Sequence, residues 1–228
     1  MKLIKVFSDG PFKNVKFNEG YNIVLATIHD KEKKKDTHNL GKTSLLVVID
    51  FLLLSTFTKK SPILTNQIFS TQTFFLELLL NSGKYLVIRR GIEKPSKISF
   101  KLNEIPLTNF DIPTEWDEEN VAFEEAKDML NTFLGYDVLT NWLYRKSISY
   151  FLRSQKDYLD VFQLNKFKGK HITWKPFVFD LLGFDGSLVE KKLHCDDEIV
   201  GKESEIATLQ KQASIDIAER DKIIGLIE

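Results

Sequence analysis

The chain has 228 residues, with 32 basic and 32 acidic side chains, so its formal net charge is zero. Its composition is 43% hydrophobic and 28% charged, which is typical of a globular protein with a buried core and excludes a disordered or membrane protein. A neutral chain lacks the bulk positive charge that holds nucleic acid non-specifically. Any contact with nucleic acid must therefore be local.

The single cysteine, Cys195, excludes an intramolecular disulfide framework and a cysteine-based zinc site, and it favours a reducing compartment. The N-terminal residues lack the long apolar region of a secretory signal. The most apolar stretch, residues 45–54, is about half the length of a membrane span and contains Asp50. We therefore expect a cytoplasmic protein with no membrane-spanning helix.

The N-terminal part of the sequence has the order of a phosphate-binding turn. Alternating apolar and polar residues predict short strands at residues 2–7 and 15–17, and the apolar run at 21–26 predicts a buried strand. The chain is then polar until Gly41-Lys42-Thr43-Ser44, which opens an apolar helix that runs through Leu54. Strand, polar loop and helix in this order fit a site for a phosphate chain.

The middle of the sequence predicts a β-hairpin. Strand-like runs at residues 73–80 and 84–92 flank Asn81-Ser82-Gly83, and residues 98–102 add a third strand. We expect Arg89 and Arg90, near the end of the second run, to pair with nearby acidic side chains.

Residues 105–116 predict a loop, residues 117–134 an amphipathic acidic helix, and residues 138–163 a helical or mixed section. From Ile199 onward the chain favours a helix with apolar residues at three- and four-residue spacing. These residues are Ile206, Leu209, Ala213, Ile223 and Ile227. The stripe predicts either the start of a coiled coil or a helix packed on its own domain. We accordingly divide the chain into residues 1–198 and a helical tail, residues 199–228.

The Gly-Lys-Thr sequence carries the chemistry. A phosphate chain needs converging backbone N–H groups, a compact cation and a hydroxyl that holds Mg²⁺. Lys42 would neutralise the β and γ phosphates, and Thr43 would ligate Mg²⁺. The candidate nucleotide-binding residues are Asn39, Leu40, Gly41, Lys42, Thr43 and Ser44. The match to G-x-x-x-x-G-K-[ST] is partial, because Asp36 stands where the first glycine belongs, and the alternative is a helix N-terminus at which Gly41 only ends a loop.

These residues resemble a known family. The N-terminal part of the chain is similar to the opening of the ATPase heads of SMC-like proteins, the ABC-class machines of chromosome maintenance and DNA repair. The similarity lies in the N-terminal strand pair, in Asn22-Ile23-Val24-Leu25 and in His38-Asn39-Leu40-Gly41-Lys42-Thr43-Ser44-Leu45. The long loop before the lysine is similar to that of bacterial SMC-like ATPases from defence-type operons. The resemblance implies an α/β P-loop NTPase fold of the ABC and SMC-like type, with a mixed sheet. The chain would be an N-terminal half-head that ends in the start of a coiled-coil helix.

The resemblance also implies site residues. Residues 147–158 are similar to the segment that carries the Q-loop glutamine. Gln155 is therefore a candidate to bind Mg²⁺ and the attacking water. The alternative is that Gln155 is an ordinary surface residue. A complete head also needs a Ser-Gly-Gly-type signature and an apolar strand that ends in Asp-Glu. Phe177-Val178-Phe179-Asp180 is similar to that strand, but Leu181 stands where the catalytic glutamate belongs. The catalytic residues therefore stay unassigned.

The sequence thus predicts the ATP·Mg-binding half of an ATPase of DNA repair, chromosome maintenance or anti-phage defence. ATP would be hydrolysed only when a C-terminal half-head and a second copy complete the site, and DNA would be a partner of the complete protein. Two other classes stay open. One is a stand-alone P-loop nucleotide kinase or NTPase, with Asp180 as its acidic Mg²⁺ support. The other is a non-catalytic interaction protein whose tail helix pairs with a partner.

Overall fold

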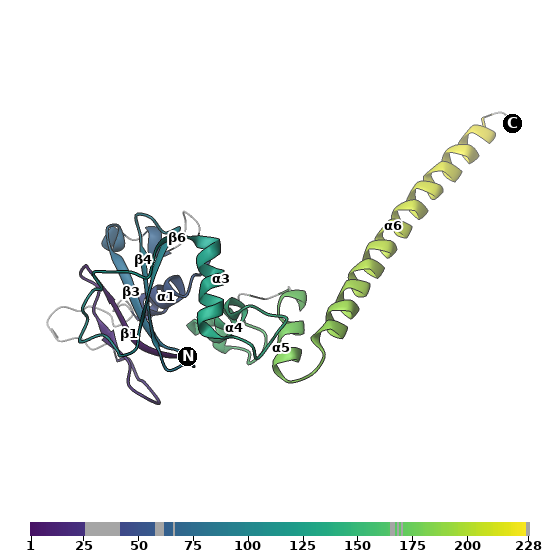
Figure 1. Cartoon of the computed structure of the whole chain (residues 1–228). Helices are drawn as coiled ribbons and strands as arrows, with labels where there is room; N and C mark the ends of the chain where they lie inside the picture. Colours follow the sequence, from purple (N-terminus) through teal and green to yellow (C-terminus); the bar gives the residue numbers. More distant parts are fainter. Residues whose placement is uncertain are drawn as a thin grey trace. The chain divides into compact units, whose positions relative to one another are not determined.

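The chain divides into two compact units, Met1–Tyr158 and Leu159–Glu228, and each unit is described by itself (Figure 1). The computed structural model describes residues 1–25, 42–57, 62–65, 67–164, 167, 169 and 171–226.

The first unit is built on a six-stranded sheet with the strand order β2-β1-β3-β4-β5-β6. All five neighbouring pairs are antiparallel, so the parallel pairing that a mixed sheet needs does not occur among the described strands. The strands are β1 (Lys2–Ser8), β2 (Val15–Lys16), β3 (Thr73–Leu79), β4 (Tyr85–Gly91), β5 (Lys97–Asn103) and β6 (Glu118–Ala122). The expected hairpin is confirmed: β3 and β4 pair in continuous register from Thr73 opposite Gly91 to Leu79 opposite Tyr85.

The helices of this unit are short. The helix expected after the Gly-Lys-Thr sequence is confirmed as α1. The elements are α1 (Lys42–Leu52), α2 (Pro62–Thr65), the 3-10 helix η2 (Gln67–Phe69), α3 (Phe123–Leu134), α4 (Tyr144–Phe151) and the 3-10 helix η3 (Gln155–Tyr158).

The acidic helix expected over residues 117–134 begins only at Phe123, because residues 118–122 form the edge strand β6. Val121 pairs with Ile98 of β5 and packs against the core. The register shifts between Ile98 and Phe100, and there Asn120 has a left-handed backbone, with φ of 55°. The Asn120 amide donates to the Ser99 hydroxyl at 3.1 Å. Pairing with a neighbouring strand thus overrides the local preference for a helix.

The buried strand expected at residues 21–26 is also wrong over its described residues, 21–25. They pair with no described strand, and their apolar side chains are exposed, Tyr21 by 91% and Leu25 by 78%. An apolar strand is buried only where a second layer covers it. The described part of this unit supplies no such layer at residues 21–25.

The two faces of the sheet have different partners. Alternate residues of β3 and β4, Phe74, Leu76, Leu86 and Ile88 among them, belong to the hydrophobic core that α1 and α3 complete. The opposite face is covered by the expected loop between β5 and β6. There Phe7 stacks on Phe75 at 5.0 Å between ring centroids, and Trp116 of the loop stacks on Phe75 at 6.3 Å.

A buried ion pair fixes this loop to the sheet. Lys5 of β1 and Glu77 of β3 lie 3.1 Å apart, and both are almost fully buried. Glu77 Oε1 accepts from the Leu107 amide at 2.6 Å, and the Lys5 ammonium donates to the Leu107 carbonyl. Each charge thus has a charged partner and a bond to the loop backbone.

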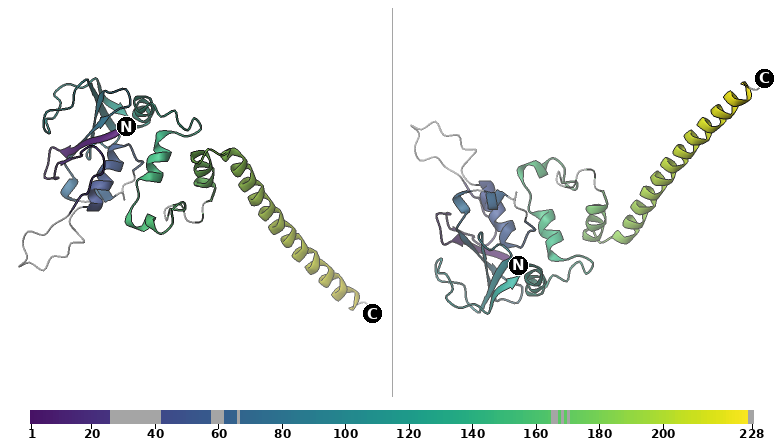
Figure 2. Two further views of the ribbon diagram at one scale, coloured as in Figure 1. Left: turned by 90° about the horizontal axis from the view of Figure 1, so that it is seen from below. Right: turned by 90° about the horizontal axis from the view of Figure 1, so that it is seen from above.

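In the second unit, the 3-10 helix η5 (His171–Thr173) and α5 (Lys175–Leu181) precede α6 (Gly186–Ile224). Helix α6 has 39 residues and is unbroken (Figure 2). Asp185 caps its first turn by accepting from the Ser187 amide at 2.9 Å, so the helix begins well before the expected tail boundary at Ile199. Among the described residues, no helix is both long and apolar enough to cross a membrane.

The buried pair allows a direct test of the fold. We expect Lys5→Met to lower the free energy of unfolding by about 3–5 kcal/mol, because it leaves the Glu77 carboxylate buried without its cation. The double variant Lys5→Met with Glu77→Gln should recover much of this loss, since the glutamine can still accept from the Leu107 amide. Urea denaturation monitored by circular dichroism measures both, and a double variant no more stable than Lys5→Met would contradict this account.

Candidate functional site

The candidate phosphate site lies at the N-terminal end of α1. The helix begins at Lys42; Thr43 is exposed, Ser44 is half-buried and Leu45 is buried. The Thr43 hydroxyl can therefore reach a ligand in solvent. Asn39, Leu40, Gly41 and the side chain of Lys42 lie outside the described residues.

Sequence pattern explains why α1 forms here. Leu45, Val48, Ile49 and Leu52 recur at helical spacing and are buried in the core, where α1 contacts β3 and β4. The first turn holds no acidic residue. The positive end of the helix dipole lies at this turn, and the amides of a first helical turn have no acceptor within their own helix.

The other end of α1 is held by a buried arginine, Arg90 of β4. Its guanidinium donates to the carbonyls of Phe51 at 2.5 Å, Pro95 at 2.7 Å and Ser55 at 3.3 Å. Burial lowers the pKa of Arg90 to about 9, so the side chain keeps its charge at neutral pH. A cation at this position also complements the negative end of the helix dipole.

Three aromatic rings surround the same guanidinium. The Cζ atom of Arg90 lies 4.0 Å from the ring centroid of Phe51 and 4.8 Å from those of Phe57 and Phe123. The faces of the rings carry partial negative charge, which stabilises a desolvated cation. Nη2 has no acceptor among the described residues, so the rings and the three carbonyls together offset the cost of burial.

Helix α4 holds the same end of α1 from a second direction. The Tyr144 hydroxyl and Arg145 Nη1 both donate to the Leu53 carbonyl, each at 3.1 Å. Arg145 Nη2 also donates to Asp50 Oδ1 at 2.7 Å. Burial raises the pKa of Tyr144 above its usual value, so the hydroxyl stays protonated and remains a donor.

Gln155, the candidate Q-loop residue, begins η3, which follows α4. Its side chain lies outside the described part of the structure. The turn that presents it is fixed by Asp157, whose carboxylate accepts from the Ser154 amide at 2.9 Å and the Ser154 hydroxyl at 2.7 Å. Binding of one Mg²⁺ by both Gln155 and Thr43 is a prediction from the sequence.

Asp180 does not end a strand. The segment expected to be similar to the Asp-Glu strand is helix α5, and Asp180 Oδ1 accepts from the Gly186 amide at 2.7 Å. Gly186 has no room for a side chain, because a Cβ atom there would lie 2.3 Å from the Pro176 carbonyl oxygen. Asp180 thus contributes to the tight corner between α5 and α6. Among the residues the structure describes, no group of three or more His, Cys, Asp or Glu is placed to hold a metal ion.

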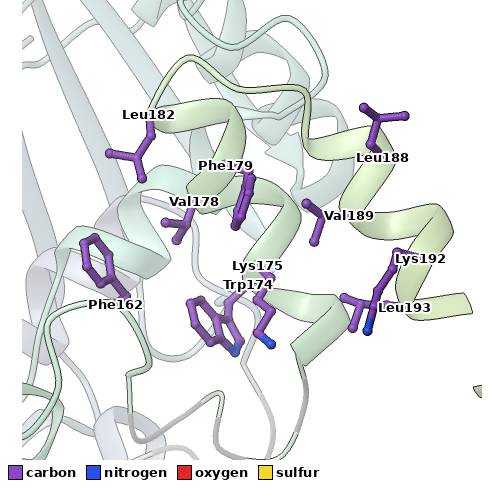
Figure 3. A pocket seen from close by; sticks show the side chains of 10 residues that line it. All are labelled: Phe162, Trp174, Lys175, Val178, Phe179, Leu182, Leu188, Val189, Lys192 and Leu193. Atoms are coloured by element: carbon purple, nitrogen blue, oxygen red, sulfur yellow. The ribbon is translucent and has the colours of Figure 1, made fainter. Parts of the chain in front are cut away.

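The second unit carries an apolar groove between α5 and the first turns of α6, with a volume of about 580 Å³ (Figure 3). Phe179, Leu182 and Leu188 line it and are exposed, and Trp174 lies at one end. The Trp174 indole nitrogen is buried and has no acceptor among the described residues. The described lining of this groove is therefore largely apolar.

No protein-family model matches the chain, and no curated protein matches it.

Sequence analysis located α1 but missed what holds its C-terminal end. The expected pairing of Arg89 with an acid is confirmed by Glu119 at 2.9 Å, whereas Arg90 contacts carbonyls and rings. One signal was present: Asp50 lies inside a run of apolar residues, and a carboxylate there needs a cation. Nothing in the sequence identified Arg145 as that cation, because 95 residues separate the two.

Arg90 can be tested by a variant that keeps its charge. We expect Arg90→Lys to lower the free energy of unfolding by about 2–4 kcal/mol, because one ammonium cannot serve three carbonyls in the geometry of a guanidinium. Arg90→Met should cost more, since it removes all three guanidinium hydrogen bonds and the charge that the aromatic rings stabilise. Chemical denaturation measures both, and a Lys variant as stable as the wild type would show that the shape of the guanidinium is unimportant.

Proposed function

We propose that the chain binds ATP·Mg at the N-terminal end of α1 and is the N-terminal half of an SMC-like ATPase head. The observation that carries this proposal is the start of α1 at Lys42, directly after Gly41, with Thr43 exposed in a first turn that has no acid. A helix N-terminus with a lysine and a hydroxyl supplies the three groups that a Mg²⁺-bound triphosphate needs.

Two apolar surfaces support an incomplete head. Residues 21–25 expose apolar side chains directly before the phosphate segment, and Ile206, Leu209 and Ile223 of α6 are also exposed. Contiguous exposed apolar surface is typical of sites that contact another polypeptide. A C-terminal half-head would cover residues 21–25. A partner helix of the coiled coil would cover the exposed apolar residues of α6. A second copy would close over the nucleotide, and DNA would bind the completed protein.

A second candidate is a non-catalytic interaction protein. It is favoured by the apolar groove between α5 and α6 and by the long exposed helix that follows it. In that case α6 would pair with a partner helix, and the Gly-Lys-Thr sequence would only begin α1. Titration with nucleotide separates the two candidates, because only the first binds ATP.

The lysine is the first test. We expect Lys42→Ala to weaken ATP·Mg binding at least about tenfold, since a charged hydrogen bond contributes about 1.5–3 kcal/mol. Isothermal titration calorimetry measures the affinity, with Lys13→Ala, an exposed lysine outside the site, as the matched control. Thr43→Ala should remove the dependence on Mg²⁺, and Thr43→Ser should keep it. Equal affinity in wild type and Lys42→Ala would falsify the assignment.

Turnover is the second test. Phosphate release by the isolated chain should stay at background, because Lys42 and Thr43 would position the nucleotide but no general base is assigned. General-base assistance typically contributes about 10²–10⁴-fold. Robust turnover by this chain alone, abolished by Lys42→Ala, would instead indicate a stand-alone NTPase. That enzyme would need an acid other than Asp180 to support Mg²⁺, because Asp180 bonds the Gly186 amide.

A further inference from the structure

Two kinds of contact hold α1 among the described residues. Along its length the helix packs through Leu45, Val48, Ile49 and Leu52, which are buried in the core. Apolar packing depends on contact area and has little directional preference. Directional bonds occur at the C-terminal end, where Arg90, Tyr144 and Arg145 donate to the backbone of residues 51–55. These bonds fix the position of α1 along its own axis.

Among these donors, Arg145 has a distinct role. It donates to the Asp50 carboxylate in α1 and to the Leu53 carbonyl just after the last residue of the helix, so it restrains both the axial position and the rotation of the helix. Its side chain is 18% exposed, whereas Arg90 is fully buried within the aromatic rings. Arg145 can therefore be replaced without opening a large cavity in the core.

We infer that Arg145 is a positioning residue for the phosphate site. By fixing the C-terminal end of α1, it places the first-turn amides and the Thr43 hydroxyl at the other end where a phosphate chain meets them. A helix moves along its axis nearly as one body, because its internal hydrogen bonds repeat at every residue. A misplacement of about 1 Å in an active site can cost about 10²-fold in rate, and a hydrogen bond to a bound phosphate likewise weakens as its geometry departs from alignment. This inference rests on the proposed function and adds the residue that holds its site in place.

The simplest alternative is that Arg145 only stabilises the fold. A structural role lowers the melting temperature, and it leaves ATP affinity unchanged where the protein is folded. The test therefore compares affinity at matched stability. Leu130→Ala is the control for stability, because Leu130 is fully buried on α3 and Leu→Ala changes in a core typically cost about 2–5 kcal/mol. Lys101→Met is the control for charge, because it removes an ion pair of 3.0 Å between Lys101 and Asp117 of the loop that covers the other face of the sheet.

The experiment measures melting temperature without ligand and the dissociation constant of ATP·Mg by calorimetry, at a temperature where every variant is folded. We expect Arg145→Met to weaken binding about ten- to a hundredfold and Arg145→Lys to recover part of it, because lysine keeps one charged bond to Asp50. Lys101→Met should bind as the wild type does. Leu130→Ala should melt earlier with unchanged affinity.

Each other outcome overturns the inference in a distinguishable way. If wild type binds ATP, Lys42→Ala weakens binding and Arg145→Met does not, the phosphate site stands and Arg145 has no positioning role. If Leu130→Ala weakens binding as much as Arg145→Met at equal loss of melting temperature, the effect is one of stability. If the wild type binds no ATP, the proposed function itself fails, and the role of Arg145 fails with it.

Discussion

The guanidinium of Arg90 joins the sheet to the helix that carries the candidate site, and the first unit depends on that junction. The last carbonyls of a helix have no partner within it, and in a core they need donors from elsewhere. Arg90 of β4, a strand on which α1 packs, donates to the Phe51 carbonyl in the last turn of α1 and to the Ser55 carbonyl beyond the helix. Because the contacts of its guanidinium are carbonyls and aromatic rings, its charge serves the backbone rather than a side-chain ion pair.

The opposite face of the sheet is covered by a loop and not by helices. A loop of more than ten residues must cover β1, β3 and β4 there, although a loop has no ladder of its own to satisfy its backbone. The Lys5–Glu77 pair bonds the amide and the carbonyl of Leu107, and the stacked rings of Phe7, Phe75 and Trp116 fill the remaining surface. The sheet is thus buried on both faces, by helices on one and by a loop on the other.

Much of this unit can be predicted from local sequence. Asn81-Ser82-Gly83 between two apolar runs predicts the hairpin, and the glycine at its end has the positive φ that such a turn needs. The start of α1 follows from the change of a polar segment into apolar residues at helical spacing. Both signals lie within a few residues, so tertiary structure does not change them.

Prediction from the sequence fails where the local structure depends on a partner that is distant in the chain. The acidic residues 118–122 favour a helix locally and form β6 because β5 offers an unpaired edge. The apolar run at 21–25 has the composition of a buried strand, and its exposure follows from the absence of a covering layer in the described part of this unit. The contacts of Arg90 and Arg145 also join segments far apart in the chain, which residue pattern alone does not identify.

Binding and chemistry place separate demands on a nucleotide site, and the half-head that we propose would meet them unequally. Binding needs donors and cations that match the phosphates, and a single helix N-terminus with a lysine and a threonine supplies these. Hydrolysis also needs a base that activates water and charge that appears only when the site closes. In the half-head that we propose, the contacts that fix α1 at its C-terminal end serve the first demand. The apolar residues 21–25, which are exposed in the described part of the unit, would meet the polypeptide that serves the second.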